Sequence, residues 1–356
     1  MNIQFANSLR VKLEDVPPEI EKLLQNEIPL HIINSEMKES DFRIKFKKKI
    51  NTNTKYLYIS LLALFDNNNL YLLDHKGNKF LYSPYIKDFY VEENFNSEYF
   101  FEIFEYIFMN KILENDLMFL HSSALKYNDK TIVFPACNNT GKTKVLLEFL
   151  DDGATFLGDD WCIIDKESNI SPFFRNIRLY PNDIIEHKNF IKDWRVIPSF
   201  IHNYFDDSKE VKFLRIFKKI YEKILLRTRI LPYKVDVKEY SYDISINNKY
   251  KADLIVFYSR NNLSKIEHEI MNSEIAARKM IYAIFNENTK KPDFENWFLF
   301  ANETAKDLRT YMEDQYFSIM KSAFSKSKVV WLQIPRSAKP KDIKKYLLDE
   351  ILSDDV

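Results

Sequence analysis

Short segments of alternating apolar and polar residues fill most of the first 95 positions of the chain. They include FRIKFKKKI, KYLYISLLALF, NLYLLD and KFLYS. Alternation of this kind predicts strands that bury one face. Between the last two segments, Asp74 to Asn78 contain Gly77, which favours a hairpin turn. The pattern therefore predicts a β-rich region at the start of the chain.

The period changes to that of a helix over residues 97 to 115. This segment, SEYFFEIFEYIFMNKILEN, places five apolar residues on one helical face: Phe100, Phe104, Ile107, Phe108 and Ile112. We expect a helix that packs this face against a sheet. Together with the preceding strands, it forms a predicted N-terminal β-rich (α+β) domain of residues 1–115.

From residue 116 onward, apolar strands alternate with helical segments. The predicted strands lie at 117–125, 131–135, 252–259 and 328–334, and helices are predicted after the loop at 136–143, at 273–285 and near the end of the chain. ATFLGDDWCIID adds a strand, a pair of aspartates and a second strand. This order predicts an α/β domain over residues 116–356 with a mixed central sheet.

Residues 186–245 depart from this order and predict a helical insertion. Within it, KEVKFLRIFKKIYEKILLRTRI puts apolar residues on one helical face and lysines and arginines on the other. A basic face is usually only solvated, but it can also attract an acidic substrate. The sequence leaves both interpretations open.

Composition narrows the function classes. The chain has 52 basic and 52 acidic side chains, and this balance disfavours a nucleic-acid-binding protein. Its hydrophobic content of 46% supports a folded core. The N-terminus is too charged for a signal peptide, no apolar run is long enough to span a membrane, and two cysteines give no disulfide framework. We therefore expect a cytoplasmic protein without a membrane segment.

A phosphate-binding loop is predicted within TIVFPACNNTGKTKVLLEFL. The segment predicts a strand, a loop and a helix that opens on Gly141-Lys142-Thr143. Backbone N–H groups at a helix N-terminus, together with one ammonium, bind phosphate. The spacing is that of the P-loop pattern, except that Ala136 stands where a glycine is expected. The candidate nucleotide-binding residues are Asn138, Asn139, Thr140, Gly141, Lys142, Thr143 and Lys144.

Asp159 and Asp160 are the candidate carboxylates. They follow the strand after the loop helix, and strands on either side of such a helix end at one edge of the sheet. One carboxylate can hold a metal ion while the other faces an acceptor hydroxyl. The chain has only four glycines, and three of them lie between 141 and 158, which predicts sharp turns or close backbone contacts here. His121 ends a strand and is either a core histidine or a site residue.

The motifs together resemble the HPr kinase/phosphorylase-like family, and more narrowly its divergent members that act as serine kinases on peptides. The resemblance rests on His121-Ser122-Ser123-Ala124, the loop at 136–143, Gly158-Asp159-Asp160-Trp161 and Arg175. It covers residues 116–185 well and the C-terminal strand–helix pairs more loosely. It implies a P-loop of the kind found in phosphoenolpyruvate carboxykinase.

The resemblance also implies roles for single residues. Lys142 would bind phosphates, whereas Thr143 and Asp160 would bind Mg²⁺. Asp159 would be the base that faces the acceptor hydroxyl. His121 would lie near the transferred phosphate, and Arg175 would contact the phosphoryl oxygens, where charge stabilisation is worth most.

We accordingly expect an ATP- and Mg²⁺-dependent kinase that phosphorylates a hydroxyl, with serine of a peptide or protein as the first candidate. SPFFRNIRLYP stands where HPr kinases carry a Leu-Glu-Ile-Arg-Gly signature, so HPr is not the expected acceptor. A small-molecule hydroxyl and a non-catalytic nucleotide sensor remain as alternatives. The resemblance also allows a homo-oligomer.

Overall fold

A computed structural model describes most of the chain, in two compact units. It leaves out residues 6–8, 34–36, 38, 53–56, 61–62, 67–68, 83–86, 136–139, 180–232, 236, 238–245, 288–307 and 354–356. One unit comprises Met1–Arg175 and Tyr240–Val356, and the other comprises Asn176–Glu239. The predicted basic helix at 209–230 and most of the predicted insertion at 186–245 lie outside the described residues.

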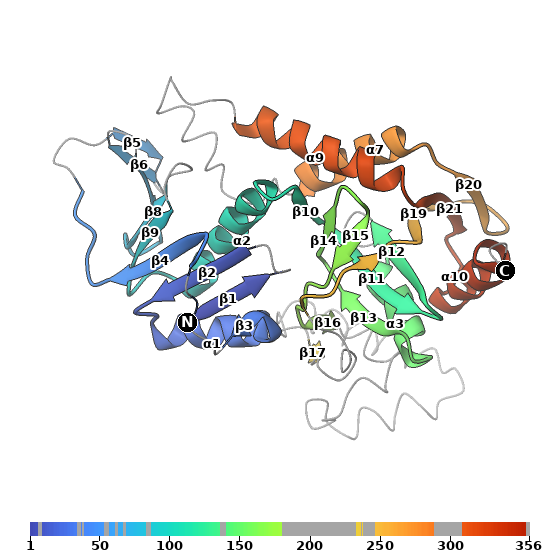
Figure 1. Ribbon diagram of the computed structural model, residues 1–356, viewed down its shortest axis with the longest axis horizontal. Helices are drawn as coiled ribbons and strands as arrows, with labels where there is room; N and C mark the ends of the chain where they lie inside the picture. The colour runs from blue at the N-terminus through green and yellow to red at the C-terminus, as the bar shows by residue number, and fades with distance from the viewer. Residues whose placement is uncertain are drawn as a thin grey trace, which may run out of the picture. The chain divides into compact units, whose positions relative to one another are not determined.

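The smaller unit contributes one antiparallel pair of strands to the described structure, β16 (Ile177–Leu179) and β17 (Tyr233–Val235). Every other described element belongs to the larger unit (Figure 1). Both sides of residue 115 belong to the larger unit. The predicted division at this residue therefore stays a prediction.

The N-terminal region forms a mixed sheet of nine strands among the described residues, in the order β3-β1-β2-β4-β9-β8-β7-β6-β5. The strands are β1 (Asn2–Phe5), β2 (Leu9–Glu14), β3 (Ile32–Ile33), β4 (Phe42–Lys47), β5 (Leu57–Ser60), β6 (Ala63–Asp66), β7 (Asn69–Leu73), β8 (Lys79–Tyr82) and β9 (Asp88–Glu92). The prediction of a β-rich first region is confirmed, as is the β7–β8 hairpin at Asp74 to Asn78.

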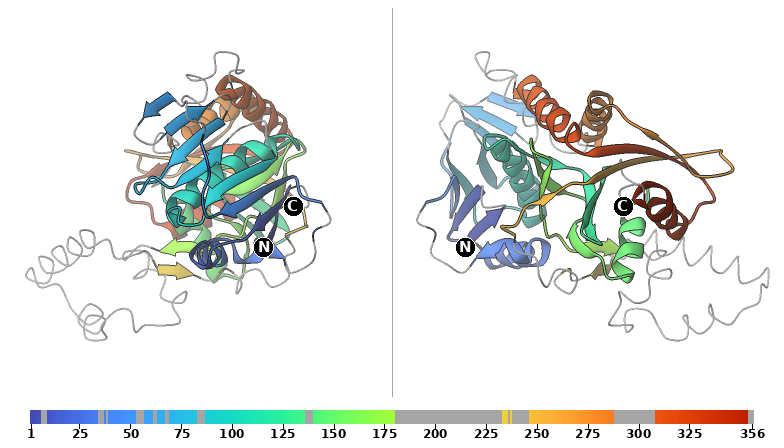
Figure 2. Two further views of the ribbon diagram at one scale, coloured as in Figure 1. Left: turned by 90° about the vertical axis from the view of Figure 1, so that its left-hand side faces the viewer. Right: turned by 45° about the vertical axis from the view of Figure 1, so that its right-hand side comes forward.

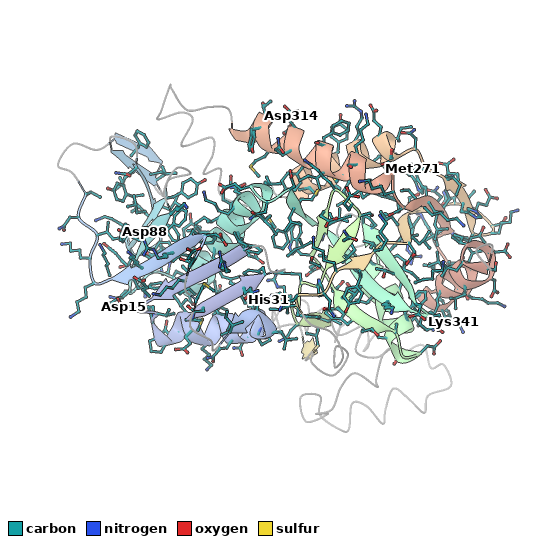
Figure 3. All side chains as sticks on the ribbon, viewed as in Figure 1. Asp15, His31, Asp88, Met271, Asp314 and Lys341 are labelled. Atoms are coloured by element: carbon teal, nitrogen blue, oxygen red, sulfur yellow. The ribbon has the colours of Figure 1, made fainter. Side chains whose placement is uncertain are left out.

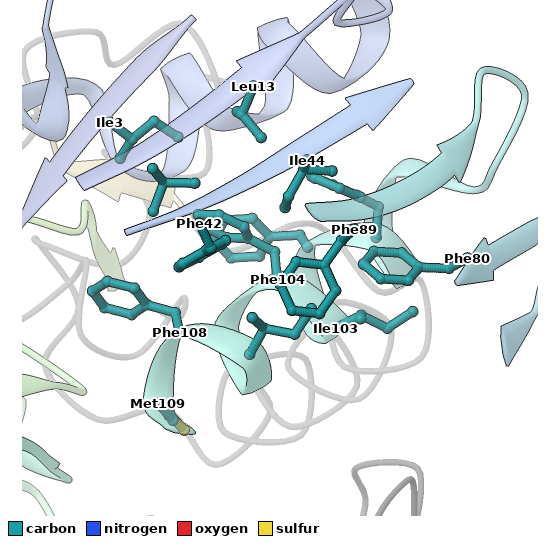
Figure 4. Packing of buried hydrophobic residues seen from close by; sticks show 14 of the residues in the cluster. Ile3, Leu13, Phe42, Ile44, Phe80, Phe89, Ile103, Phe104, Phe108 and Met109 are labelled. Carbon is teal, nitrogen blue, oxygen red and sulfur yellow. The ribbon is translucent and has the colours of Figure 1, made fainter. Parts of the chain in front are cut away.

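Helix α2 (Ser97–Leu113) packs its aromatic side chains against this sheet (Figure 4). The five positions predicted to share its apolar face are all buried, with no more than 2% of their surface exposed. Phe104 and Phe108 of α2 lie close to Phe42 of β4 in the same cluster. Helix α1 (Pro18–Glu27) and a 3₁₀ turn at Pro29–His31 complete this region.

The rest of the larger unit contains two further sheets, counted over the described residues. The first has four antiparallel strands in the order β10 (Leu117–Leu120), β14 (Cys162–Asp165), β15 (Asn169–Ser171) and β18 (Tyr250–Lys251). The second has six strands in the order β13 (Thr155–Gly158), β11 (Ser122–Tyr127), β12 (Lys130–Pro135), β19 (Leu254–Asn261), β21 (Lys328–Pro335) and β20 (Glu267–Ile270). Parallel β12, β19 and β21 lie beside antiparallel neighbours, which confirms an α/β class with a mixed sheet.

The chain changes sheet at two neighbouring points. The predicted single strand at 117–125 was wrong, because it divides at His121 into β10 and β11, which pair in different sheets. Ser122 stabilises this bend, since its hydroxyl donates to the Leu120 carbonyl and its N–H to the Asp160 carbonyl. Strands β13 and β14 change sheet in the same way through Asp159 to Trp161.

Helices cover the six-stranded sheet (Figure 2). Helix α3 (Lys142–Asp151) contacts α10 (Pro340–Tyr346), which continues as a π-helical turn at Leu347–Ile351. Helix α7 (Ser273–Glu287) pairs with α9 (Leu308–Phe324), which packs Phe324 on Phe257 of β19. Asn272 caps α7, because its side chain accepts a hydrogen bond from the Glu274 N–H.

Among the described residues, no helix combines the length and the apolar character that crossing a membrane requires.

Candidate functional site

The described part of the predicted phosphate loop consists of Thr140 and Gly141, which lead into α3. Gly141 has a φ of 93°, a left-handed conformation that glycine adopts without steric cost. Helix α3 then begins at Lys142, and the N–H groups in the first turn of a helix favour an anion. Thr143 and Lys144 belong to this turn. Ala136, Asn138 and Asn139 lie outside the described residues.

Lys142 and His121 form a buried polar pair. Only 5% of Lys142 and 4% of His121 is exposed, and Lys142 Nζ lies 2.5 Å from His121 Nε2. An ammonium group can only donate, so Nε2 accepts and the imidazole carries its proton on Nδ1. The Trp161 ring lies 5.1 Å from the imidazole. The bend between β10 and β11 thus places a histidine against the lysine of the loop.

Asp159 accepts hydrogen bonds from two hydroxyl groups. Ser123 Oγ donates to Oδ1, and Thr143 Oγ1 lies 3.0 Å from Oδ2. Burial and the neighbouring Asp160 carboxylate raise the pKa of Asp159 to about 6, against the opposing effects of Ser123, Lys142 and Thr143. A carboxylate with a pKa near neutrality suits a general base.

The turn that carries the two aspartates is tightly constrained. A Cβ on Gly158 would lie 2.8 Å from the Trp161 carbonyl oxygen, so only glycine fits without displacement. Asp160 adopts a φ of 63°, a region that aspartate tolerates better than most residues. The close backbone approach predicted from the glycine positions is confirmed at Gly158.

The oxygen atoms near α3 suit a magnesium ion. The hydroxyl of Thr143 and the carboxylate of Asp159 are hard oxygen ligands, which Mg²⁺ prefers. The structure brings Thr143 to Asp159, whereas the resemblance implies Asp160 as the metal carboxylate, so that role stays a prediction. In the part of the chain that the structure describes, no three His, Cys, Asp or Glu side chains form a metal-binding group.

Arg175 lies between two carboxylates of the N-terminal region. Its Nε is 3.2 Å from Glu27 Oε2 and its Nη1 is 2.9 Å from Glu105 Oε1. Burial opposes the charge, but Glu105, Glu27 and Asp160 together raise the pKa of Arg175. The guanidinium therefore interacts electrostatically with Asp160, whereas its ion pairs are with Glu27 and Glu105. Its contact with a phosphoryl group stays a prediction.

His31 connects the N-terminal sheet to the segment next to Arg175 (Figure 3). Its Nε2 accepts from the Phe174 N–H at 3.0 Å, so its Nδ1 carries the proton and donates to the Gln4 carbonyl at 3.1 Å. Burial lowers the pKa of His31 to about 4. Both ring nitrogens of this neutral histidine form hydrogen bonds to backbone groups inside the fold. His31 is therefore a structural residue of the core.

Two residues at the site were given no role from the sequence. Ser123 was part of the motif, but its contact with Asp159 depends on the pairing of β11 between β12 and β13. Tyr258 lies near the end of β19, where burial raises its pKa and the Thr140 side chain acts in the opposite direction. The rule that ligands bind at the carboxyl ends of parallel strands would have drawn attention to Tyr258.

Comparison with known proteins gives no family assignment. No protein-family model matches the chain, and no curated protein matches it. A proposal about function therefore rests on the geometry of these residues and on the motif resemblance.

Proposed function

We propose that the chain is an ATP- and Mg²⁺-dependent kinase with an HPr kinase-like P-loop core. It transfers the γ-phosphoryl group to a hydroxyl, and serine of a peptide or protein is the proposed acceptor. The observation that carries the proposal is the position of the Asp159 carboxylate. It lies 3.0 Å from the Thr143 hydroxyl in the first turn of the loop helix, close to the Lys142–His121 pair. Phosphoryl transfer to a hydroxyl uses phosphate-binding groups together with such a carboxylate.

The first turn of α3 and Lys142 would bind the phosphates of ATP. The N–H groups there would donate to the phosphate oxygens, and the Lys142 ammonium would leave His121 Nε2 to bind phosphate oxygens instead. The Thr143 hydroxyl, together with Asp160 as the resemblance implies, would hold Mg²⁺. When bound, Mg²⁺ supplies charge that offsets the negative triphosphate oxygens.

Asp159 would receive the proton of the acceptor hydroxyl. With a pKa of about 6, its carboxylate is mostly ionised at neutral pH. As the hydroxyl oxygen bonds to the γ-phosphorus, the bond to the bridging oxygen breaks, ADP leaves, and the hydroxyl proton moves to Asp159. The Ser123 hydroxyl already donates a hydrogen bond to this carboxylate. This contact supports the proposal that Asp159 can accept a hydrogen bond from the serine of a substrate.

A non-catalytic nucleotide sensor is the second candidate function. The ion pairs of Arg175 with Glu27 and Glu105 favour this function. A guanidinium that is bound to two carboxylates is not directed to a phosphoryl group. A sensor would bind ATP through α3 and Lys142 without turnover.

The test measures ATP turnover with a mixture of serine-containing peptides, alongside ADP affinity. For a kinase, Asp159→Asn lowers turnover by about 10²–10⁴-fold and leaves ADP binding in place. Asp314→Asn is the control, since Asp314 is an exposed carboxylate on α9 (Figure 3). ATP binding without turnover by the unmodified protein would support the sensor. If the unmodified protein bound neither ATP nor ADP, both candidates would be excluded.

A further inference from the structure

Arg260 lies at the carboxyl end of β19, next to the phosphate loop. Strand β19 pairs in parallel with β12, which leads into the loop, and with β21. Side chains two positions apart share one face of a strand, so Arg260 and Tyr258 lie on the same side of the sheet. Arg260 Nη2 would be 3.8 Å from a Cβ placed on Gly141. The guanidinium thus lies beside Gly141 at the start of α3.

The guanidinium of Arg260 is held by backbone carbonyls. Its Nη1 donates to the carbonyls of Ala338, Arg336 and Pro335 at 3.1, 3.3 and 3.4 Å. These residues form the turn between β21 and α10. The contacts use Nη1, whereas Nη2 is the nitrogen nearest Gly141. A guanidinium carries five N–H donors, so donors remain on the side that faces the loop.

Within the described residues, no carboxylate forms an ion pair with Arg260, and its hydrogen-bond partners are backbone carbonyl groups. Arg175 differs, because Glu27 and Glu105 both bind its guanidinium. Arg260 is also an exposed side chain that a ligand can reach. A cation that is fixed in place and accessible, and that forms no ion pair within the described residues, is suited to bind an anion beside the predicted phosphate loop.

We propose that Arg260 is a nucleotide-binding residue whose guanidinium binds phosphate oxygens of the nucleotide held at Thr140 to Thr143. The inference rests on the proposed function and adds a residue to that site. A guanidinium can donate two parallel hydrogen bonds to a phosphate group. Because carbonyls already orient Arg260, it binds phosphate without giving up an ion pair, which keeps the cost of binding low.

The experiment compares the affinities of unmodified protein, Arg260→Gln and Arg260→Lys for Mg-ADP, pyrophosphate and adenosine. Loss of a charged hydrogen bond weakens binding by about 10–100-fold. We expect Arg260→Gln to lose this much affinity for Mg-ADP and pyrophosphate and none for adenosine. Arg260→Lys keeps the positive charge but lacks the planar guanidinium. Its affinities for Mg-ADP and pyrophosphate should lie between those of the unmodified protein and Arg260→Gln. Arg278→Gln is the control, because it removes an exposed arginine of α7 that pairs with Glu274.

Thermal unfolding of each variant separates binding from folding, since Arg260 also holds the turn before α10. If Arg260→Gln does not fold, Arg260→Lys decides: weaker Mg-ADP binding at an unchanged midpoint supports the inference, and unchanged binding overturns it. Equal losses for adenosine and pyrophosphate would also overturn it. If Lys142→Ala abolishes Mg-ADP binding while Arg260→Gln binds normally, the inference fails and the proposed kinase stands. If the unmodified protein binds none of the three ligands, both fail.

Discussion

Asp159 is a buried carboxylate whose ionisation costs folding free energy. Its pKa is raised from 3.8 to about 6 in the folded chain. Between these values the folded state keeps the proton that the unfolded state has lost. The free energy of unfolding therefore falls as pH rises through this window, and the penalty is fully present above pH 6 or so.

The Asp159→Asn variant should be more stable than the unmodified protein at neutral pH. The asparagine removes the ionisation penalty, which is on the order of 1–3 kcal/mol. We expect its excess free energy of unfolding to grow between pH of about 4.5 and about 7.5, as measured by denaturant titration at both values. The same variant is expected to lose turnover, so stability and activity change in opposite directions. A variant that is less stable at both pH values would contradict this account of Asp159.

Gly158 is the residue that allows the aspartate turn to close. The Gly158→Ala variant places a methyl group 2.8 Å from the Trp161 carbonyl oxygen, and backbone cannot move as freely as a side chain. We expect a loss of about 1–3 kcal/mol in stability. Turnover should fall as well, because Asp159 follows directly. Urea unfolding and an ATPase assay on the same preparation measure both effects, and unmodified behaviour in both would show that the turn adapts.

At the scale of elements, α3 is held at its C-terminal end by α10. Lys344 Nζ donates to the Glu148 carbonyl at 2.7 Å and to the Asp152 carboxylate, while only 8% of Lys344 is exposed. A positive charge at a helix C-terminus interacts favourably with the helix dipole. Lys344 therefore fixes the end of the helix whose other end begins the proposed phosphate site.

The Lys344→Met variant keeps the aliphatic stem and removes this ammonium. We expect it to lower the free energy of unfolding by about 1–2 kcal/mol. Lys341→Met is the matched control, because Lys341 is exposed on the same helix (Figure 3). Thermal unfolding should distinguish the two. Equal changes in the unfolding midpoint of both variants would mean that the contact of the Lys344 ammonium with α3 does not stabilise the fold.

The elements with clear periodicity were predicted well from the sequence. Helix α2 and the strands around the loop and the aspartates lie where their patterns placed them. The strand at 117–125 was wrong because its residues are buried on both sides of His121, so the apolar pattern shows no break there. Only the pairing partners of β10 and β11 divide it, and those partners lie further along the chain.

At the scale of the whole molecule, the site draws on residues far apart in the sequence. The sequence predicts the loop and the aspartates as site residues because their motifs are short and local. The partners of Arg175 are 148 and 70 positions away, and no local pattern marks Glu27 or Glu105. The N-terminal sheet also shares its apolar cluster with Phe119 and Phe173, which follow the predicted boundary at 115. The first 115 residues thus pack against the segment that carries the candidate site.

Arg175→Met tests this connection. The side chains of Arg175, Glu27 and Glu105 are only 10%, 6% and 16% exposed, so removing the cation breaks two ion pairs in a poorly hydrated place. We expect a loss of about 3–5 kcal/mol in the free energy of unfolding. Arg43→Met is the control, because Arg43 pairs with Asp88 at the surface, where an ion pair is worth about 1 kcal/mol or less. Denaturant unfolding of both variants measures the difference. A different result would be that Arg175→Met loses no more free energy of unfolding than Arg43→Met but abolishes turnover. Arg175 would then act on the phosphoryl group, and its ion pairs with Glu27 and Glu105 would not stabilise the fold.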